Sequence, residues 1–210
     1  MRLNRIMPVL LVALPMPGCD DEFQGASTSI AESWTVNSPP TVVIDACGGG
    51  IWVRRSKVNE VKAVVARNSS CKNRSQTAAE ESLRFIDVRM SKEEETIRIV
   101  TRRTDNGATG CDLTTSVGVY VPDDAKLDLR TDIGSIWVTG SPREVKASNS
   151  GGATRFELEP PGHTKTADPQ PLKLEGWGGD VEIKLGPTGY EFNGSVKVVE
   201  NWYSDRQPEL

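Results

Sequence analysis

The chain has 210 residues, of which 37% are hydrophobic, with 19 glycines and 13 prolines. This length fits one domain of ordinary size with short terminal segments, and the Gly and Pro content favours many turns over long helices. With 25 basic and 29 acidic residues, the net charge of −4 argues against a nucleic-acid-binding surface. Two short basic clusters, Arg54–Arg55–Lys57 and Arg102–Arg103, are interpreted as solvated strand faces or turns, with contact to a polyanion as the alternative.

The first residues predict an export signal. Arg2 and Arg5 precede a short apolar segment, which falls well below the roughly 20 apolar residues that span a bilayer. Gly18-Cys19 follows and resembles the lipobox of bacterial lipoproteins, which implies removal of residues 1–18 and acylation of Cys19. An ordinary signal peptide cut elsewhere is the alternative. Both interpretations predict an exported protein, and the first predicts a membrane anchor in the cell envelope, on the periplasmic side or the cell surface.

Three further cysteines, Cys47, Cys71 and Cys111, fit one disulfide and one free thiol in an oxidising compartment. Cys71 and Cys111 both lie in polar, loop-like sequence, which favours their pairing, and the other two pairings stay open. A zinc site is a poor alternative because the chain has no Cys-x-x-Cys motif and its single histidine is His163. No metal and no cofactor is predicted.

After a polar tether at 19–30, apolar and polar residues alternate with period two, as is typical of half-buried strands. The clearest examples are 85–89, 96–100 and 117–121. The Ala- and Glu-rich segment 75–83 predicts a short helix instead. Residues 201–210 are polar and predict a loose tail.

Comparison of the chain with itself finds a repeat in which an apolar residue is followed by glycine five positions on and by apolar residues seven and nine positions on. The copies span 44–53, 129–138 and 174–183, with Gly49, Gly134 and Gly179 at the shared position, and a degenerate copy spans 147–156 with Gly152. Glycine accepts a positive φ that other residues resist, so it predicts a turn between two strands. One copy is too short to bury its apolar face. Stacked copies therefore predict an all-β, β-solenoid-like fold of strand–Gly-turn–strand repeats.

Residues 119–138 carry V-x-V-P at 119–122 and T-x-x-G-x-I-x-V at 131–138. This segment resembles the signature of the bacterial putative-adhesin family of β-strand repeats, a domain of unknown function. The resemblance covers roughly residues 31–200. It implies a β-solenoid or a twisted, sandwich-like β stack on exported or membrane-anchored proteins, and it carries over no catalytic residue. Cys47 and Trp177 depart from the usual polar repeat positions without affecting the expected fold.

No constellation for catalysis is found. His163 lies in a Pro-rich loop without a Ser or Cys motif, so a catalytic triad is unsupported. Asp105-Asn106-Gly107 resembles the start of a calcium loop, but the rest of such a loop is missing and a turn is favoured. Asp123-Asp124 after Pro122 also predicts a turn. The prediction is a protein that is not an enzyme, with a polysaccharide-active enzyme as a remote alternative because β-solenoids also host polysaccharide lyases.

Trp52 and Trp137 occupy the same repeat position, between two apolar residues that point inward. Strand alternation then points both indoles outward, where they would stack on sugars or anchor a protein partner. The alternative is that a neighbouring loop, the helix at 75–83 or the tail around Trp202-Tyr203 covers them.

Together these features predict a non-enzymatic cell-envelope lipoprotein with a β-repeat domain at 31–200 that binds a surface partner, either a glycan or an envelope protein, and no nucleic acid. Two alternatives stay open. One is a structural protein that self-associates through its end strands, and the other is a sensor of envelope stress.

Overall fold

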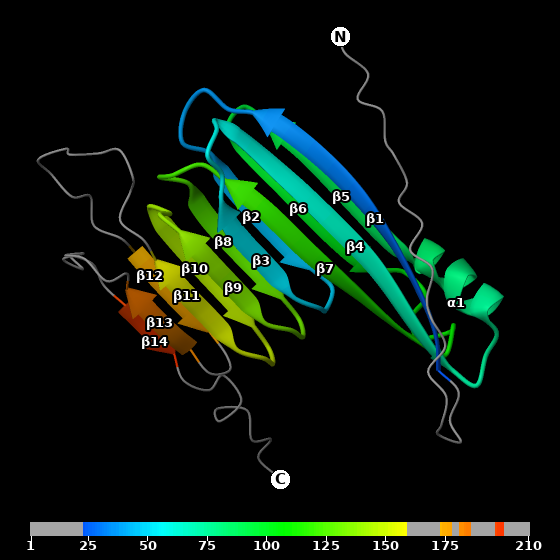
Figure 1. Ribbon diagram of the computed structural model, residues 1–210. Coiled ribbons are helices and arrows are strands. Elements are labelled where there is room, and N and C mark those ends of the chain that lie inside the picture. Colours follow the sequence, from blue (N-terminus) through cyan, green and yellow to red (C-terminus); the bar gives the residue numbers. More distant parts are fainter. Residues whose placement is uncertain (1–22, 159–172, 178–180, 186–195, 200–210) are drawn as a thin grey trace, which may run out of the picture.

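The structure is a computed structural model that describes residues 23–158, 173–177, 181–185 and 196–199 (Figure 1). This part of the chain is mostly β, as the period-two alternation predicts, and consists of two seven-stranded sheets with one short α-helix and one turn of 3₁₀-helix. The two sheets pack face to face, because the buried core draws residues from both of them.

The first sheet has the strand order β1 (Phe23–Thr35), β4 (Glu60–Lys72), β7 (Cys111–Val121), β3 (Ile51–Arg55), β9 (Ile136–Gly140), β11 (Thr154–Leu158), β13 (Val181–Leu185). The second has the order β14 (Val196–Val199), β12 (Lys173–Trp177), β10 (Glu144–Asn149), β8 (Lys126–Thr131), β2 (Thr41–Ala46), β6 (Thr96–Arg103), β5 (Ile86–Glu93). Figure 1 shows the long strands β1, β4 and β7 side by side, with the shorter strands following along the sheet.

Both sheets are mixed. At one end, β1 pairs antiparallel with β4, β4 with β7, and β5 with β6. The other described pairings are parallel, and they join the strands of the repeat copies to one another and to the neighbouring strands β6, β7 and β14. Each copy contributes its first strand to the second sheet and its next strand to the first sheet. Because of the antiparallel end, the sheets form neither a closed solenoid nor a barrel, and the repeat pattern did not predict that end.

Burial follows the alternation that the sequence predicts. Along β7 every second residue, from Cys111 to Val121, is buried, and the residues between them face outward. The buried residues of the repeat strands are mainly Val, Ile and Leu, and Phe156 is the largest fully buried side chain. Removing this apolar surface from water, at about 25 cal/mol per Å², is the main force that holds the two sheets together.

Register agrees with the sequence repeat for the second strand of each copy and departs from it once in the first strand. Ile51 pairs with Ile136, Ile136 with Thr154, and Thr154 with Val181. In the second sheet the prediction aligns Leu174 with Leu129, yet the strand that lies between them pairs Leu174 with Val145 and Val145 with Leu127. Leu174 and Val181, seven residues apart, therefore take the register places of Leu127 and Ile136, which are nine residues apart. This shifts β12 by two residues, one full pleat, and a shift by an even number leaves the alternation of the strand unchanged.

The turn glycines lie one above another, and this stacking explains why the repeat requires them. Gly49, Gly134 and Gly152 have φ angles of 88°, 138° and 117°. A Cβ atom on Gly134 would overlap the backbone of Gly49, and one on Gly152 would lie 2.5 Å from the carbonyl oxygen of Gly134. Gly134 N–H also donates to the carbonyl of Gly151 at 2.8 Å. The backbones of neighbouring turns thus pack directly against one another, at a separation that leaves no space for a Cβ atom and therefore requires glycine.

Buried hydroxyl and amide groups line the same turns. Thr131, which lies three residues before Gly134, donates its hydroxyl to the Gly49 carbonyl at 2.9 Å. Thr115 donates to the Gly48 carbonyl at 2.9 Å, and the Asn149 amide donates to the Gly152 carbonyl at 3.2 Å. These bonds satisfy carbonyls that the tight turns leave outside the strand ladders. The threonine of the T-x-x-G motif therefore has a structural role.

The predicted helix at 75–83 is confirmed as α1 (Gln76–Ser82), with Ser75 as its N-cap. The Ser75 hydroxyl accepts from the Ala78 N–H at 3.2 Å, as N-cap serines do. Ala79 and Ser82 are buried against the ends of the long strands, where a second small apolar cluster contains Cys71, Cys111 and Ile86. Figure 1 shows α1 at this end of the molecule, away from β3 and β9, so it does not cover the two tryptophans.

The predicted tether at 19–30 is wrong for residues 23–30. β1 begins at Phe23, so residues 23–30 belong to the first sheet and pair with Lys72 through Val65 of β4. Small and polar residues suggested a linker there, but their cross-strand partners place them in the ladder. Residues 19–22 lie outside the described part. Among the described residues there is no helix of the length and apolarity that a membrane crossing requires.

Candidate functional site

The two candidate tryptophans lie together on the outer face of the first sheet. Trp52 of β3 is the direct register partner of Trp137 of β9, and their flanking residues Ile51, Val53, Ile136 and Val138 are buried. Trp52 is 36% exposed, whereas Trp137 is half-buried. A narrow hollow of about 190 Å³ is lined by both indoles together with Arg54 and Thr139. Their outward orientation is therefore as the alternation predicts, and their binding role stays a prediction.

Among the described residues, it is a side chain of the same sheet that lies over Trp137. Arg155, its register partner on β11, lies over the indole with its guanidinium carbon 5.2 Å from the ring centroid. Arg155 in turn pairs with Glu157 at 2.7 Å. The indole Nε1 of Trp137 is buried without a hydrogen-bond partner among the described residues. Trp137 therefore lines one side of the hollow, and Trp52 is the more exposed of the two rings.

Gly50 provides the space for the Trp52 indole, a relationship that the sequence pattern did not reveal. The φ angle of Gly50 is not among the positive ones, so backbone conformation does not explain its glycine. A Cβ atom there would lie 2.6 Å from Cη2 and 2.9 Å from Cζ2 of Trp52. The six-membered ring of Trp52 therefore lies over Gly50, and the side chain of any other residue at position 50 would clash with the ring in this position.

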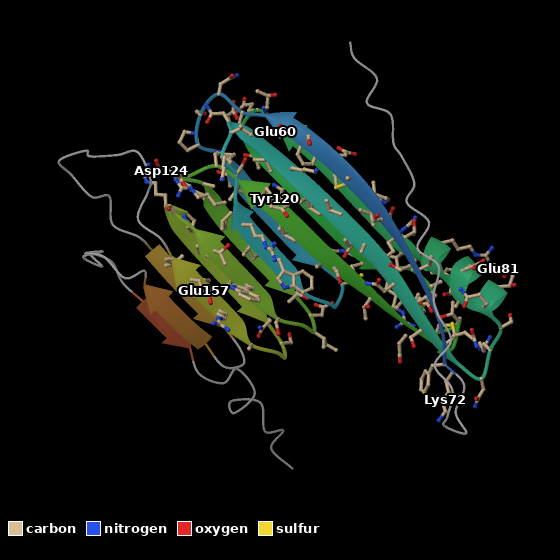
Figure 2. The ribbon with its side chains drawn as sticks, in the orientation of Figure 1. Glu60, Lys72, Glu81, Tyr120, Asp124 and Glu157 are labelled. Atoms are coloured by element: carbon tan, nitrogen blue, oxygen red, sulfur yellow. A yellow bond between two sulfur atoms is a disulfide. The ribbon has the colours of Figure 1, made fainter. Side chains whose placement is uncertain are left out.

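A second row of outward side chains runs beside the tryptophans. Tyr120 of β7 is 40% exposed and is flanked in register by Lys62 on β4 and Arg54 on β3, both of them exposed. Glu157 continues the face on β11, and Figure 2 labels Tyr120 and Glu157 on it. We refer to Trp52, Arg54, Lys62, Tyr120 and Trp137 as the aromatic face.

The outer face of the second sheet is different in kind, since its charges are largely paired with one another. Arg102 pairs with Asp45, Arg130 with Asp128 at 3.2 Å, and Arg89 with Asp87 at 2.7 Å. The hydrogen bond from Arg102 to Asp45 raises the pKa of that guanidinium above its usual value. No Trp or Tyr lies in the described side chains of this face. This is the arrangement of an ordinary solvated face.

A larger hollow of about 720 Å³ lies at the loops that follow β1, β3 and β7. It is lined by residues 36–39, 55–59 and 122–124, which places the basic residues Arg55 and Lys57 beside Asp123 and Asp124. Arg55 pairs with Asp123 at 2.6 Å, so both charges are largely neutralised. The expected turn at Asp123-Asp124 is confirmed, with Asp124 at a φ of 63°.

The turn interpretation of Asp105-Asn106-Gly107 is also confirmed, with Asn106 and Gly107 at positive φ. Arg103 donates to both oxygens of the buried Asp105 carboxylate, from Nε to Oδ1 at 2.5 Å and from Nη2 to Oδ2 at 3.0 Å, and the Thr109 hydroxyl donates to Oδ2 at 2.6 Å. Arg103 first, and then Thr109, hold the pKa of Asp105 well below its usual range. Both carboxylate oxygens are therefore engaged within the turn. In the described part of the chain no group of three His, Cys, Asp or Glu residues is placed to hold a metal ion.

The favoured disulfide is confirmed: Cys71 and Cys111 are bonded, and they are direct cross-strand partners on β4 and β7 with a Cα–Cα distance of 4.3 Å. Cys47 is a free thiol that accepts a hydrogen bond from Thr101 at 3.4 Å. Cys19, His163, Gly179 and Trp202 lie outside the described residues, and so does residue 177 as far as its side chain is concerned.

Comparisons with known proteins find similarity of structure only. No protein-family model matches the chain, and no curated protein matches it. A solved structure described as a "putative cell adhesion protein" from Clostridium sporogenes has a TM-score of 0.46 and 6% identity, over 82% of this chain and 98% of that one. A "putative lipid binding protein" from Parabacteroides distasonis has a TM-score of 0.37 and 12% identity, over 81% of this chain and 62% of that one. A "putative adhesin" from the same organism has a TM-score of 0.33 and 9% identity, over 81% of this chain and 70% of that one. At these values the likeness is loose, and it assigns neither a family nor a function to this chain.

Proposed function

We propose that this chain is an exported, membrane-anchored envelope protein whose aromatic face binds a surface glycan without catalysing a reaction. The observation that carries the proposal is the exposed Trp52 indole, which lies over Gly50 and beside Trp137. An exposed indole with a dedicated place on a rigid sheet offers a flat apolar surface next to polar groups, which suits the faces of sugar rings. A binding role for the Trp52 ring would explain both why position 50 is glycine and why the indole is exposed.

The contrast between the two sheets supports this choice of surface. Among the described residues, only the outer face of the first sheet carries exposed aromatic side chains. Scattered exposed apolar residues need no explanation, but Trp52, Tyr120 and Trp137 lie on three neighbouring strands. We also interpret β2–β3, β8–β9, β10–β11 and β12–β13 as successive turns of a solenoid-like stack, which would set these rings in rows across the strands.

Self-association through the end strands is less well supported at the β1 and β5 edges. Glu32 of β1 pairs with the buried Ala63, so a carboxylate lies on the inner side of this edge. Lys92 of β5 reaches across to the Thr35 carbonyl at 2.7 Å and links the two edge strands. Inward charges and covered edges are the devices by which sheets avoid pairing with other chains.

The glycan proposal is tested by measuring binding to purified bacterial cell-wall glycans for Trp52→Ala and Gly50→Ala. We expect both variants to bind at least about tenfold more weakly, the first because the ring is lost and the second because the ring is displaced. Gly25→Ala is the matched control, since a Cβ there makes only an ordinary contact of 3.7 Å with the Ser69 carbonyl. Unchanged binding by Trp52→Ala in a folded protein would contradict the proposal.

The anchor is tested separately, by the intact mass of protein extracted from bacterial membranes. We expect a mass that corresponds to a chain beginning at an acylated Cys19, and the Cys71–Cys111 disulfide agrees with an oxidising compartment. An unmodified chain that begins elsewhere would remove the anchor from the proposal and would leave an exported, soluble binding protein.

A further inference from the structure

Two cations flank Tyr120, the tyrosine of the aromatic face. Lys62 and Arg54 are the register partners of Tyr120 on its two sides, so three neighbouring strands present a cation, a phenol and a cation in one row. Strands in a sheet lie about 4.8 Å apart, so the row spans roughly two strand spacings. A ligand lying on Tyr120 would therefore be within reach of both charged groups.

The two cations are not neutralised by the described part of the protein. Neither Arg54 nor Lys62 makes an ion pair there, whereas Arg155 on the same face is paired with Glu157. Among the described side chains of this face, the other acidic ones are Glu60, two residues before Lys62, and Asp112, at the far end of β7. The chain as a whole carries a net charge of −4, so the two cations beside Tyr120 differ in sign from the net charge of the protein. An anion on the ligand would complete this site.

We infer that the glycan bound by the aromatic face is an anionic polysaccharide, with Arg54 and Lys62 holding its acidic groups and Trp52 and Tyr120 contacting its ring faces. This inference rests on the proposed function and specifies its ligand. A guanidinium pairs with carboxylate or phosphate through two parallel hydrogen bonds, and a lysine ammonium adds a flexible point charge. The rings are arranged across the strands, so an extended polymer lying across β7, β3 and β9 would meet Tyr120, then Trp52, then Trp137.

The test uses the whole protein and three probes: alginate, whose acidic groups are carboxylates, carboxyl-reduced alginate as its neutral counterpart, and purified wall teichoic acid, whose acidic groups are phosphates. Binding is measured by isothermal titration calorimetry for the wild type, for Arg54→Gln/Lys62→Gln and for Arg98→Gln/Lys146→Gln. The last variant removes two exposed cations from the outer face of the second sheet, so it has the same net charge as the first variant.

We expect the wild type to bind one or both acidic polymers and to lose affinity as salt is raised, because exposed charges are screened. Arg54→Gln/Lys62→Gln should weaken that binding roughly tenfold or more, and Arg98→Gln/Lys146→Gln should leave it within about twofold. A preference for alginate would identify carboxylate as the recognised group, and a preference for teichoic acid would identify phosphate.

The inference fails if the wild type binds reduced and unreduced alginate equally and the Arg54/Lys62 variant binds like the wild type. It also fails if the protein binds only neutral cell-wall glycans, and in both cases the glycan-binding role itself would stand. If Trp52→Ala leaves all glycan binding unchanged, or the wild type binds no glycan at all, the proposed function and the inference fail together.

Discussion

Replacing Gly134 with alanine should lower the free energy of unfolding by more than about 3 kcal/mol, one of the largest effects expected of a single methyl group in this chain. Two costs combine at this position. The φ angle of 138° lies in a region that side chains rarely adopt, and the new Cβ would overlap the backbone of Gly49, which cannot move without disturbing its own turn. Urea denaturation followed by tryptophan fluorescence measures the change.

Two matched variants separate these costs. Gly107 also has a positive φ, of 81°, but nothing lies within 4 Å of an added Cβ, so Gly107→Ala should cost only about 1–2 kcal/mol. Gly151, in the turn next to Gly134, has neither constraint, and Gly151→Ala should stay within about 0.5 kcal/mol of the wild type. If Gly134→Ala proved no more costly than Gly107→Ala, close packing of the turns would not be what requires glycine.

Removing the disulfide should have an effect of similar size. Cys71 and Cys111 are 40 residues apart in sequence, and closing a loop of this length restricts the unfolded chain by about 4 kcal/mol. The loop contains α1, β5 and β6, which include two strands of the second sheet. We therefore expect Cys71→Ser/Cys111→Ser to lose about 2–4 kcal/mol in urea denaturation, and the wild type to lose a similar amount when it is reduced.

Cys47→Ser is the control for this experiment, because Cys47 is unpaired and accepts only a hydrogen bond from Thr101. It should change stability by less than about 1 kcal/mol, and adding reductant should then have the same effect on it as on the wild type. Equal stability of the oxidised wild type and the double serine variant would show that α1, β5 and β6 are held by packing alone.

The sequence predicted local structure better than it predicted sheet topology. Alternation gave the strands and the outward direction of Trp52, and Ser75 with the Ala- and Glu-rich segment gave the helix. The period-two alternation does not indicate which strands pair with one another, so the antiparallel pairing of β1, β4 and β7 could not be predicted from it. The same limit applies to β12, whose register is shifted by an even number of residues that leaves the hydrophobic pattern unchanged.

The candidate site was predicted only in part, for a related reason. Trp52 and Trp137 share a repeat position, so their proximity could be expected from the repeat itself. Tyr120 lies on a strand outside the aligned copies, and only cross-strand pairing brings Tyr120 and Lys62 to Arg54. The place of Gly50 under the indole depends on the rotamer of Trp52, about which neighbouring residues in sequence carry little information.

The in-register pairing of the β8–β9 and β10–β11 units has a consequence for how such a molecule can change its size. An extra unit inserted between them would meet compatible partners on both sides, provided that its turn also carried glycine at the stacked position. Each insertion would widen the outer face of the first sheet by one strand spacing, about 4.8 Å, while leaving the antiparallel end and its disulfide untouched. If the aromatic face binds a polymer as proposed, the length of polymer contacted would be set by gene duplication, in steps of one unit, rather than by redesign of the surface.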